Sequence, residues 1–588
     1  MNTKKRMFTA LCGFGVAASI LAACGNVTEE APAATGNGNG AATDTAVEAP
    51  ALTGSRIVPE GETLRLTFYN ADGAMNPAGG QSAVMEEITR RTGIELEVIT
   101  PMAGNDEYTD IPLFITQGNV PDLIFANTVT GMLIEHEAIV DLAPFIMSDA
   151  GADIRALYGP MVGRLRHSNE DPRIFTAGTT FVDYERMTTS GTAQVQMSVM
   201  RHAGFPEITT LAELEEIIAD YIEANPEING QPTIGLTLIG SNWRWGITVG
   251  NPSKFATGVT DDGGWAVDET GQATLNWLRP ETKEYFRWLN GMNHRGLLDE
   301  EWLTQTEDQY FEKISTGRAL AVMDQNWSIG SSQAALRDAG LQDDGDSHWR
   351  MMMPVPVMLT DDMVPQVTRP TGWRAMAGIG VSATSEHQAE AKAFLNWMAS
   401  EEAQILMNWG IEGVHYFYDE NGVRTFYPEM AEIRDTDSDT WQRVFGIGNY
   451  VHPFPQLGNT TLDSTGNPIT PNDRTNHLRN LTDAQRETLD AFGVEMFIDK
   501  FPTFPAGSEI PHGEAWTINT GSGTEFDILM GQIDPFAQEQ VSRMIMVNPD
   551  EFDALWDAFV DTLVDMGAER AGELFTEYVR DRIELWSS

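Results

Sequence analysis

The chain has 588 residues, of which 41% are hydrophobic, and its formal net charge is −49. This length is ample for more than one packed core, and the acidity argues against nucleic acid as a partner, because carboxylates and phosphates repel each other. We interpret the acidity as a means of staying soluble in a salty or alkaline exterior, with steering of a cationic ligand as the alternative. Only Cys12 and Cys24 are cysteines, and we expect Cys12 to be removed, which excludes disulfides and cysteine chemistry from the folded part.

The N-terminus has the form of a bacterial lipoprotein signal. Residues 4–6 are basic, residues 7–21 are apolar, and two alanines precede Cys24. The apolar stretch is too short for a transmembrane helix. We predict a signal peptide over residues 1–23 and a lipid, including palmitate, on Cys24, which would anchor the chain at the extracytoplasmic face of the cell membrane. The alternative is an ordinary signal peptide with an incidental cysteine.

Residues 24–62 are expected to form a flexible tether. Ala, Gly, Asn, Thr, Pro and Glu dominate this segment, and such a composition cannot bury enough apolar surface to fold. The glycine and asparagine run at residues 36–40 lacks the preceding strand and following helix that a phosphate-binding loop needs.

An alternating pattern of strands and helices follows the tether. Residues 64–70 and 94–98 alternate apolar and polar side chains, a helix pattern covers 82–91, another helix is expected at 111–117, and 123–126 is a continuous apolar strand. This order predicts a parallel sheet covered by helices. Ligands bind beyond the carboxyl ends of such strands, so we expect Asn70 and Asn127 at the binding edge.

Helix signals continue to the end of the chain. Thr210 and Glu213 predict a capping box at the start of a helix. Ser385 is expected to cap a second helix, and Asn548 with Pro549 a third that ends at Gly567. No fixed-period repeat is present, which argues against a solenoid.

Five segments in a fixed order carry a family resemblance. They are QGNVPDLI at 117–124, residues 194–213 with AGFP inside them, STGRALAV at 315–322, residues 382–409, and WGIEGVHY at 409–416. In this joint order the chain resembles the extracellular solute-binding proteins of ABC importers, in particular the long lipoprotein branch that binds sugars and oligosaccharides.

The resemblance implies an α/β fold of the type II periplasmic-binding-protein kind, with two hinge-connected lobes of parallel-rich sheets flanked by helices. We expect lobe 1 at 63–190 and 356–395, and lobe 2 at 191–355 and 396–588 with the C-terminal helices. It implies a monomer that is not an enzyme. Its partners would be the transmembrane subunits of an ABC permease, and the membrane would be reached through the lipid on Cys24.

Saccharide binding needs aromatic platforms and hydrogen-bonding side chains, because sugar rings have apolar faces and hydroxyl edges. Three short stretches supply both, and packing is the alternative role for each tryptophan. The candidate ligand-binding residues there are Trp243, Trp245, Asp324, Asn326, Trp327, Trp373 and Arg374. Trp409, Glu412, His415 and Tyr416 match the family pattern but could equally stabilise a lobe.

A weak calcium candidate lies at residues 225–233, where some relatives carry a calcium loop. Asn225, Glu227 and Asn229 place oxygen atoms on alternate positions, but Thr233 and Ile234 stand where acids are expected. An ordinary Asn-Gly turn is the alternative, and no cofactor is expected.

The sequence leaves several functional classes open. Our expectation is a substrate-binding component that captures a carbohydrate, an oligosaccharide by preference, and delivers it to a permease. A lipid-anchored glycosidase with paired carboxylates is the main alternative; a receptor for peptide or another polar solute and a surface adhesin or sensor subunit are others. The sequence has no P-loop and no Gly-x-Ser-x-Gly elbow, and His136-Glu137 lacks the second histidine of a zinc-protease motif.

Overall fold

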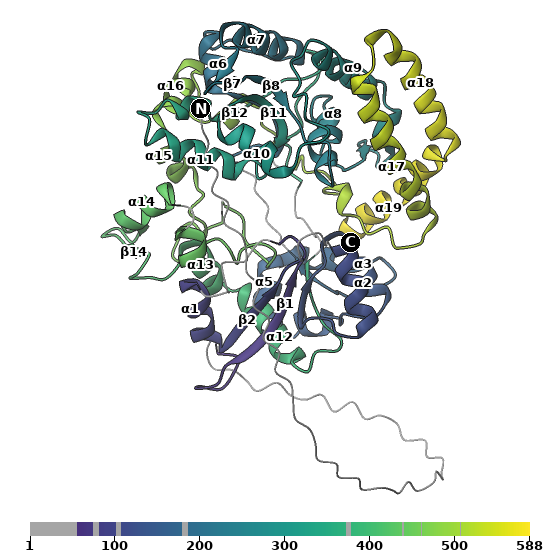
Figure 1. Ribbon diagram of the computed structural model, residues 1–588. Coiled ribbons are helices and arrows are strands. Elements are labelled where there is room, and N and C mark those ends of the chain that lie inside the picture. Colours follow the sequence, from purple (N-terminus) through teal and green to yellow (C-terminus); the bar gives the residue numbers. More distant parts are fainter. Residues whose placement is uncertain are drawn as a thin grey trace, which may run out of the picture. The chain divides into compact units, whose positions relative to one another are not determined.

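The computed structural model describes residues 56–73, 82–101, 107–178, 186–371, 378–437, 440–459, 461–505 and 507–587. Two larger sheets organise this part of the chain, one of five strands and one of four (Figure 1). Each sheet has its own hydrophobic core. We refer to the two assemblies as the first lobe and the second lobe. The predicted signal peptide, most of the tether and Cys24 lie outside the described residues.

The first lobe contains a mixed sheet in the order β2-β1-β3-β13-β4, of which β1, β2 and β3 are parallel as predicted. Its strands are β1 (Leu64–Asn70), β2 (Ile94–Ile99), β3 (Leu123–Phe125), β4 (Ala177–Gly178) and β13 (Gly378–Val381). The strand β1 is parallel to both β2 and β3. The strand β13 is antiparallel to both of its neighbours, β3 and β4. Every residue of β3 is buried, as a continuous apolar run in a doubly covered sheet should be.

Helices and one hairpin complete the first lobe. The helices are α1 (Ala83–Thr92), α2 (Glu107–Gln117), α3 (Thr130–Glu135), α4 (Ala143–Ile146), α5 (Ala152–Tyr158), α12 (Gln388–Met398), α13 (Glu401–Trp409) and α14 (Pro428–Thr436), and the hairpin is β14 (Tyr416–Tyr418) with β15 (Arg424–Phe426). The predicted first helix is confirmed: Ser82 accepts a hydrogen bond from the Met85 amide, and Gly93, at φ 78°, ends the helix.

The first lobe extends beyond the expected boundary at residue 395. Trp397, Met407, Trp409 and Phe454 all belong to the core around its sheet. The reason is local packing, because α12 contacts α5 and β13, and α13 contacts α1. Residues 396–457 therefore belong to the first lobe and not, as expected, to the second, and Val357, expected in the first lobe, belongs to the core of the second.

The family-like segment at 409–416 has a packing role in the first lobe. The Trp409 ring stacks on Phe426 at 4.7 Å between centroids, and Trp409 Nε1 donates to the Ile469 carbonyl. His415 is buried, its Nδ1 accepts from the Ile411 amide at 2.9 Å, and burial lowers its pKa to about 4. These contacts fix the loop between α13 and β14.

The second lobe is built on the sheet β12-β5-β11-β8. Its strands are β5 (Gly191–Gln196), β8 (Ile234–Thr237), β11 (Ala319–Gln325) and β12 (Met352–Val355). The strands β11 and β8 are parallel, and β5 is antiparallel to β11 and β12. All seven residues of β11 are buried, so this strand is covered on both faces.

Many helices surround the second sheet. They are α6 (Met197–His202), α7 (Leu211–Ala224), α8 (Pro252–Phe255), α9 (Pro280–His294), α10 (Glu307–Ser315), α11 (Gly330–Gly340), α15 (Arg474–Arg479), α16 (Asp483–Phe492), α17 (Glu525–Met546), α18 (Pro549–Asp565) and α19 (Ala568–Ser587). Two hairpins, β6 (Glu227–Ile228) with β7 (Gln231–Pro232) and β9 (Trp265–Val267) with β10 (Ala273–Leu275), lie among them. The Thr210 capping box and the Asn548 cap are confirmed.

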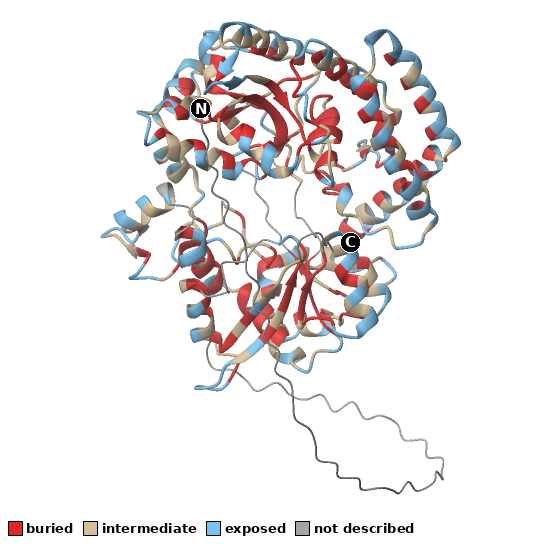
Figure 2. Cartoon of the chain, in the orientation of Figure 1, coloured by how far each residue is buried: buried red, intermediate tan, exposed pale blue. Residues whose placement is uncertain are grey.

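The C-terminal helices complete the core of the second lobe. Figure 2 shows that buried residues gather in the strands and on the inner faces of the helices. The helix α17 packs on α9, and α19 packs on β10. Trp265 stacks on Phe575 with 4.5 Å between ring centroids, and Phe286 stacks on Trp556 at 5.6 Å. Within the described residues, no helix combines the length and apolar character that crossing a membrane requires.

Candidate functional site

Two tryptophans form an exposed platform at the edge of the second sheet. The parallel strands β8 and β11 end at the same edge, and the loops that follow them carry Trp243 and Trp327. Their rings lie 6.0 Å apart between centroids with an angle of 14° between the planes, and the residues are 57% and 59% exposed. Large aromatic residues are mostly buried, so a stacked and exposed pair beyond strand ends is a typical feature of a binding surface.

The platform is held by a charged side chain that the sequence reasoning did not single out. The Arg244 guanidinium lies 4.5 Å from the Trp243 ring centroid and 4.9 Å from that of Phe311. It donates to the Ser328 hydroxyl at 2.9 Å and pairs with Glu307 at 2.7 Å. A guanidinium that is stacked and paired at once fixes the indole above it.

Asp324 lies beneath the platform and does not face solvent. It is fully buried and accepts hydrogen bonds from the Tyr310 hydroxyl at 2.7 Å and the Ser328 hydroxyl at 2.9 Å. Burial raises the pKa of its carboxyl group, and these hydrogen bonds oppose that shift. The carboxylate therefore supports Ser328 and, through it, Arg244. Asn326 is exposed beside Trp327, and its backbone N–H donates to the Ser190 carbonyl.

Trp245 does not join the platform. It is 7% exposed, its Nε1 donates to the Ser542 hydroxyl at 2.9 Å, and its ring packs against Trp277. The chain enters a helical turn at Arg244 and Trp245, which turns this indole into the core. The structure thus gives Trp245 the packing role rather than the expected ligand-binding one. Trp373 and Arg374 lie outside the described residues.

The corresponding edge of the first sheet carries polar groups. Asn70, the last residue of β1, is buried and accepts from the Asp72 amide at 3.2 Å. Asn127, just after β3 and at φ 46°, donates through Nδ2 to Asp72 Oδ1 at 2.9 Å. His452 Nε2 lies 2.6 Å from Asp72 Oδ2, and the His452 ring meets Phe125 edge-on. The structure thus places Asn70 and Asn127 beside Asp72 at the predicted edge, but Asn70 is buried and serves the loop that follows β1.

Asp72 and His452 were missed by the sequence reasoning. Asp72 could have been found, because it follows the end of β1 by two residues. His452 carries no such signal, since it is 380 residues away from its partner in the chain.

Contacts between polar and charged side chains link the platform to the loop that follows α8. The Gln325 side chain, two residues before Trp327, donates to Asp261 Oδ2 at 3.0 Å. Lys254 Nζ lies 3.6 Å from Asp261 Oδ1, and burial lowers the pKa of this lysine. Asp262 is fully buried and accepts from the Ala515 amide at 3.0 Å, with His512 Nε2 at 3.2 Å. These contacts fix the loop that begins at Gly258.

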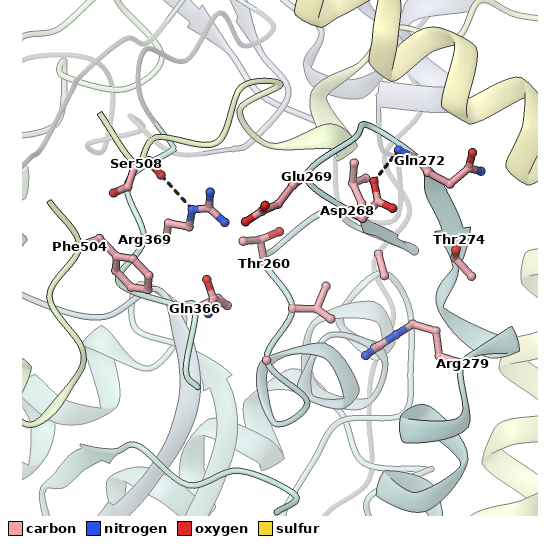
Figure 3. A pocket seen from close by; sticks show the side chains of 14 residues that line it. Thr260, Asp268, Glu269, Gln272, Thr274, Arg279, Gln366, Arg369, Phe504 and Ser508 are labelled. Atoms are coloured by element: carbon pink, nitrogen blue, oxygen red, sulfur yellow. Dashed lines mark hydrogen bonds between the residues drawn. The ribbon is translucent and has the colours of Figure 1, made fainter. Parts of the chain in front are cut away.

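A pocket of about 650 Å³ opens beside this loop. Its walls come from residues 258–279, from Gln366 and Arg369, and from Phe504 and Ser508 (Figure 3). Arg369 Nε donates to the Ser508 carbonyl at 2.9 Å. In the close-up, the Arg369 guanidinium, Glu269 and Thr260 point toward one another across the cavity.

The calcium candidate folds as a tight hairpin. Asn229 at φ 54° and Gly230 at φ 73° form the turn between β6 and β7, as an Asn-Gly pair does in a type I′ turn. The Asn225 carbonyl accepts from Thr233 at 2.6 Å, and the Arg350 guanidinium lies 3.4 Å from Asn229 Oδ1. A loop with one carboxylate and a guanidinium beside it does not fit a calcium ion. Among the described residues, no three His, Cys, Asp or Glu side chains are grouped to hold a metal.

The class of protein follows from this fold and from a family match. Residues 83–410 match the model of the bacterial extracellular solute-binding proteins, and the chain belongs to this family. This confirms the family that the ordered segments indicated.

Three known proteins resemble the chain over long stretches. The polygalacturonan/rhamnogalacturonan-binding protein YtcQ of Bacillus subtilis (strain 168) is 24% identical over 279 residues, which span 44% of this chain and about half, 48%, of that relative. The structure of the alginate-binding protein AlgQ2 without calcium ion matches with a TM-score of 0.61 and 14% identity, covering 90% of this chain and 99% of the other.

The third is an HMO binding, ABC-transporter associated solute binding protein from Bifidobacterium longum infantis ATCC 15697. It matches with a TM-score of 0.63 and 14% identity, covering 89% of this chain and 99% of that one. At this level of identity the likeness shows the fold. The expected two-lobed α/β architecture of the periplasmic-binding-protein kind is therefore confirmed.

Proposed function

We propose that this protein is the substrate-binding component of an ABC transporter, which captures an oligosaccharide and delivers it to a membrane permease. The observation that carries the proposal is the exposed Trp243 and Trp327 pair, stacked at the carboxyl edge of the second sheet. Indole faces bind the apolar faces of sugar rings. Arg244 and Glu307 hold the platform in place before a ligand arrives, and such preorganisation lowers the entropy cost of binding.

The relatives support a saccharide as the ligand. One is named for binding polygalacturonan and rhamnogalacturonan, one for alginate and one for HMO. These ligands share rings with hydroxyl edges. The polar edge of the first lobe, with Asp72, Asn127 and His452, supplies hydrogen-bonding groups for them. A ligand held by both lobes would favour the closed state, which is what a permease would recognise.

The proposal includes a membrane anchor and a monomeric receptor without enzymatic activity. A lipid on Cys24 and the tether that follows would keep the receptor at high effective concentration near its permease. Mass spectrometry of the N-terminal peptide from membranes tests the anchor, because a diacylated Cys24 is expected and an unmodified cysteine would contradict it. Sedimentation of the tether-free domain tests the monomer.

A thermal-shift screen with product analysis tests the function. Residues 56–588 are purified and heated with saccharides, from disaccharides to polysaccharide fragments, and with peptides as the matched alternative class. A ligand of the native state raises the melting temperature, and we expect saccharides to do so and to be recovered intact. Cleaved saccharide would favour the glycosidase alternative, while a shift with peptides alone would overturn the carbohydrate assignment.

A further inference from the structure

The pocket beside the 258–264 loop has the chemistry of a second contact region for a polar ring. Its volume of about 650 Å³ lies within the range of ligand pockets. Phe504 offers a ring face, and Gln366 and Thr260 offer hydrogen-bonding groups (Figure 3). An aromatic face with planar polar side chains around it matches the apolar face and hydroxyl edge of a sugar unit.

The arginine of this pocket is aimed inward. Arg369 is fixed at Nε by the Ser508 carbonyl at 2.9 Å, and its backbone amide donates to the Gln366 carbonyl. Its guanidinium faces the Glu269 carboxylate across the cavity (Figure 3). Neither Arg369 nor Glu269 forms an ion pair within the part of the chain that the structure describes. A fixed guanidinium and a carboxylate on opposite walls can each bind a pair of neighbouring hydroxyl groups.

One hydrogen bond joins the loop behind the pocket to the end of β11, which leads to Trp327. Gln325 Nε2 donates to Asp261 Oδ2 at 3.0 Å. Trp327 follows Gln325 by two residues, and Thr260, which lines the pocket, precedes Asp261. The Gln325 side chain is buried, and Lys254 holds Asp261 from below. The two surfaces are therefore held in a fixed relation by the second lobe itself.

We propose that the pocket binds further units of the same saccharide chain whose other units stack on Trp243 and Trp327. The inference rests on the proposed function and makes it more specific. Affinity for the oligosaccharide then increases with chain length until the pocket is filled. Arg369 and Glu269 are then residues that select for length, whereas the tryptophans contact ligands of every length.

Calorimetric titration tests whether affinity depends on chain length. It uses two series of oligosaccharides of defined, increasing length, which we call ladders. The probes are neutral malto-oligosaccharides and acidic oligogalacturonides, each from disaccharide to hexasaccharide. For the ladder that binds, the dissociation constant of the unaltered protein should fall with length. Arg369→Gln should weaken binding of the long members by about tenfold, the effect of losing a charge-assisted hydrogen bond, and leave the short members unchanged.

Two further variants complete the test. Glu269 lies at the exposed tip of the β9-β10 hairpin. Glu269→Gln should weaken binding of the long members in the same way, without altering the packing of Arg369. Arg287→Gln on the surface of α9, where Arg287 pairs with Glu284 and Asp553, is the matched control and should change nothing.

The outcomes separate the inference from the proposed function. A loss that is equal for short and long members, or no loss in either pocket variant, overturns the inference. If Trp327→Ala still weakens every member in that case, the proposed function stands. If no member of either ladder and no saccharide of the thermal-shift screen binds, both the inference and the oligosaccharide receptor fail.

Discussion

The two lobes present different chemistry at equivalent positions. In both, parallel strands end at one edge of a sheet, and the loops beyond that edge carry the candidate residues. The first lobe offers amide, carboxylate and imidazole groups around Asp72, whereas the second offers two exposed and mutually stacked indole side chains beside Arg244. One architecture thus supplies hydrogen bonds from one side and apolar contact from the other. A saccharide needs both, because each of its rings has both kinds of surface.

The difference also concerns how each edge is supported. Beneath the platform, Asp324, Ser328 and Tyr310 form a buried chain of hydrogen bonds. In the first lobe, Asp72 and His452 are partly exposed, with side chains that are 32% and 39% accessible. Buried networks are rigid and costly to break. We therefore expect substitutions at the two edges to affect binding and stability in different proportions.

The largest predicted effect is on the free energy of unfolding, and it distinguishes the platform tryptophans from the core beneath them. Trp245→Ala should lower the free energy of unfolding by about 3–5 kcal/mol, because it removes a buried indole and leaves a cavity. Trp327→Ala should leave it nearly unchanged, since that residue is 59% exposed. Urea denaturation of both variants checks this. An equal loss in the two would show that the platform is structural.

Ligand affinity should depend on the platform tryptophans, whose replacement has little effect on stability. Trp327→Ala or Trp243→Ala should weaken saccharide binding by about 1–3 kcal/mol, the scale of one lost aromatic contact in a site. Titration calorimetry with a ligand from the screen measures it, with Trp288→Ala on α9 as a tryptophan control away from the platform. Unchanged affinity in both platform variants would remove the indoles from the site.

The pH dependence of stability should be sharpest in the first lobe. Burial lowers the pKa of His415 to about 4 from its ordinary value near 6.5, so the unfolded chain binds the proton more readily between these values. Stability from this group is present above pH 6.5 and is lost as the pH falls toward 4, on the order of 3 kcal/mol. His415→Gln should reduce that slope in denaturant titrations at several pH values. An identical slope would contradict the assignment.

A smaller predicted effect, on ligand affinity, tests whether the polar edge of the first lobe contacts the ligand. Asp72→Asn should weaken ligand binding by about 1 kcal/mol, because it removes the charge that orients Asn127 and His452. The melting temperature should change little, since this carboxylate is partly exposed. Asp171→Asn, in a surface pair with Arg173, is the matched control. Equal affinity in both variants would leave the second lobe as the sole candidate binding edge.

Calcium should have no effect. Because Arg350 lies beside Asn229 in the β6-β7 hairpin, neither calcium nor a chelator should shift the melting temperature of the domain. An increase with millimolar calcium would contradict this description of the loop.

Much of the fold could be predicted where a pattern has one structural solution. The alternation at 64–70 and the Thr210 capping box fixed local structure in advance. Other features depend on distant partners. Ser385, expected to cap a helix, instead donates to Asp122 at 2.6 Å, and α12 begins three residues later. No local pattern distinguishes these two uses of a hydroxyl group.

The candidate site divides in the same way. The position of Trp327 could be predicted from the end of β11, because side chains that follow a buried strand lie at the sheet edge. Trp245 was misjudged because a helical turn begins beside it and rotates the indole inward. The pocket could not be foreseen, since its walls come from three segments far apart in the chain that share no motif.

The C-terminal helices also set an order of folding. Phe454 completes the core of the first lobe, whereas the core of the second lobe includes Phe575 and Val579 of α19. During synthesis the second lobe therefore cannot close until its last helix has been made, and contacts so distant in the chain form slowly. The aromatic edge should be the last part of the receptor to become competent. A nick or premature stop near α17 would leave the core of the second lobe incomplete.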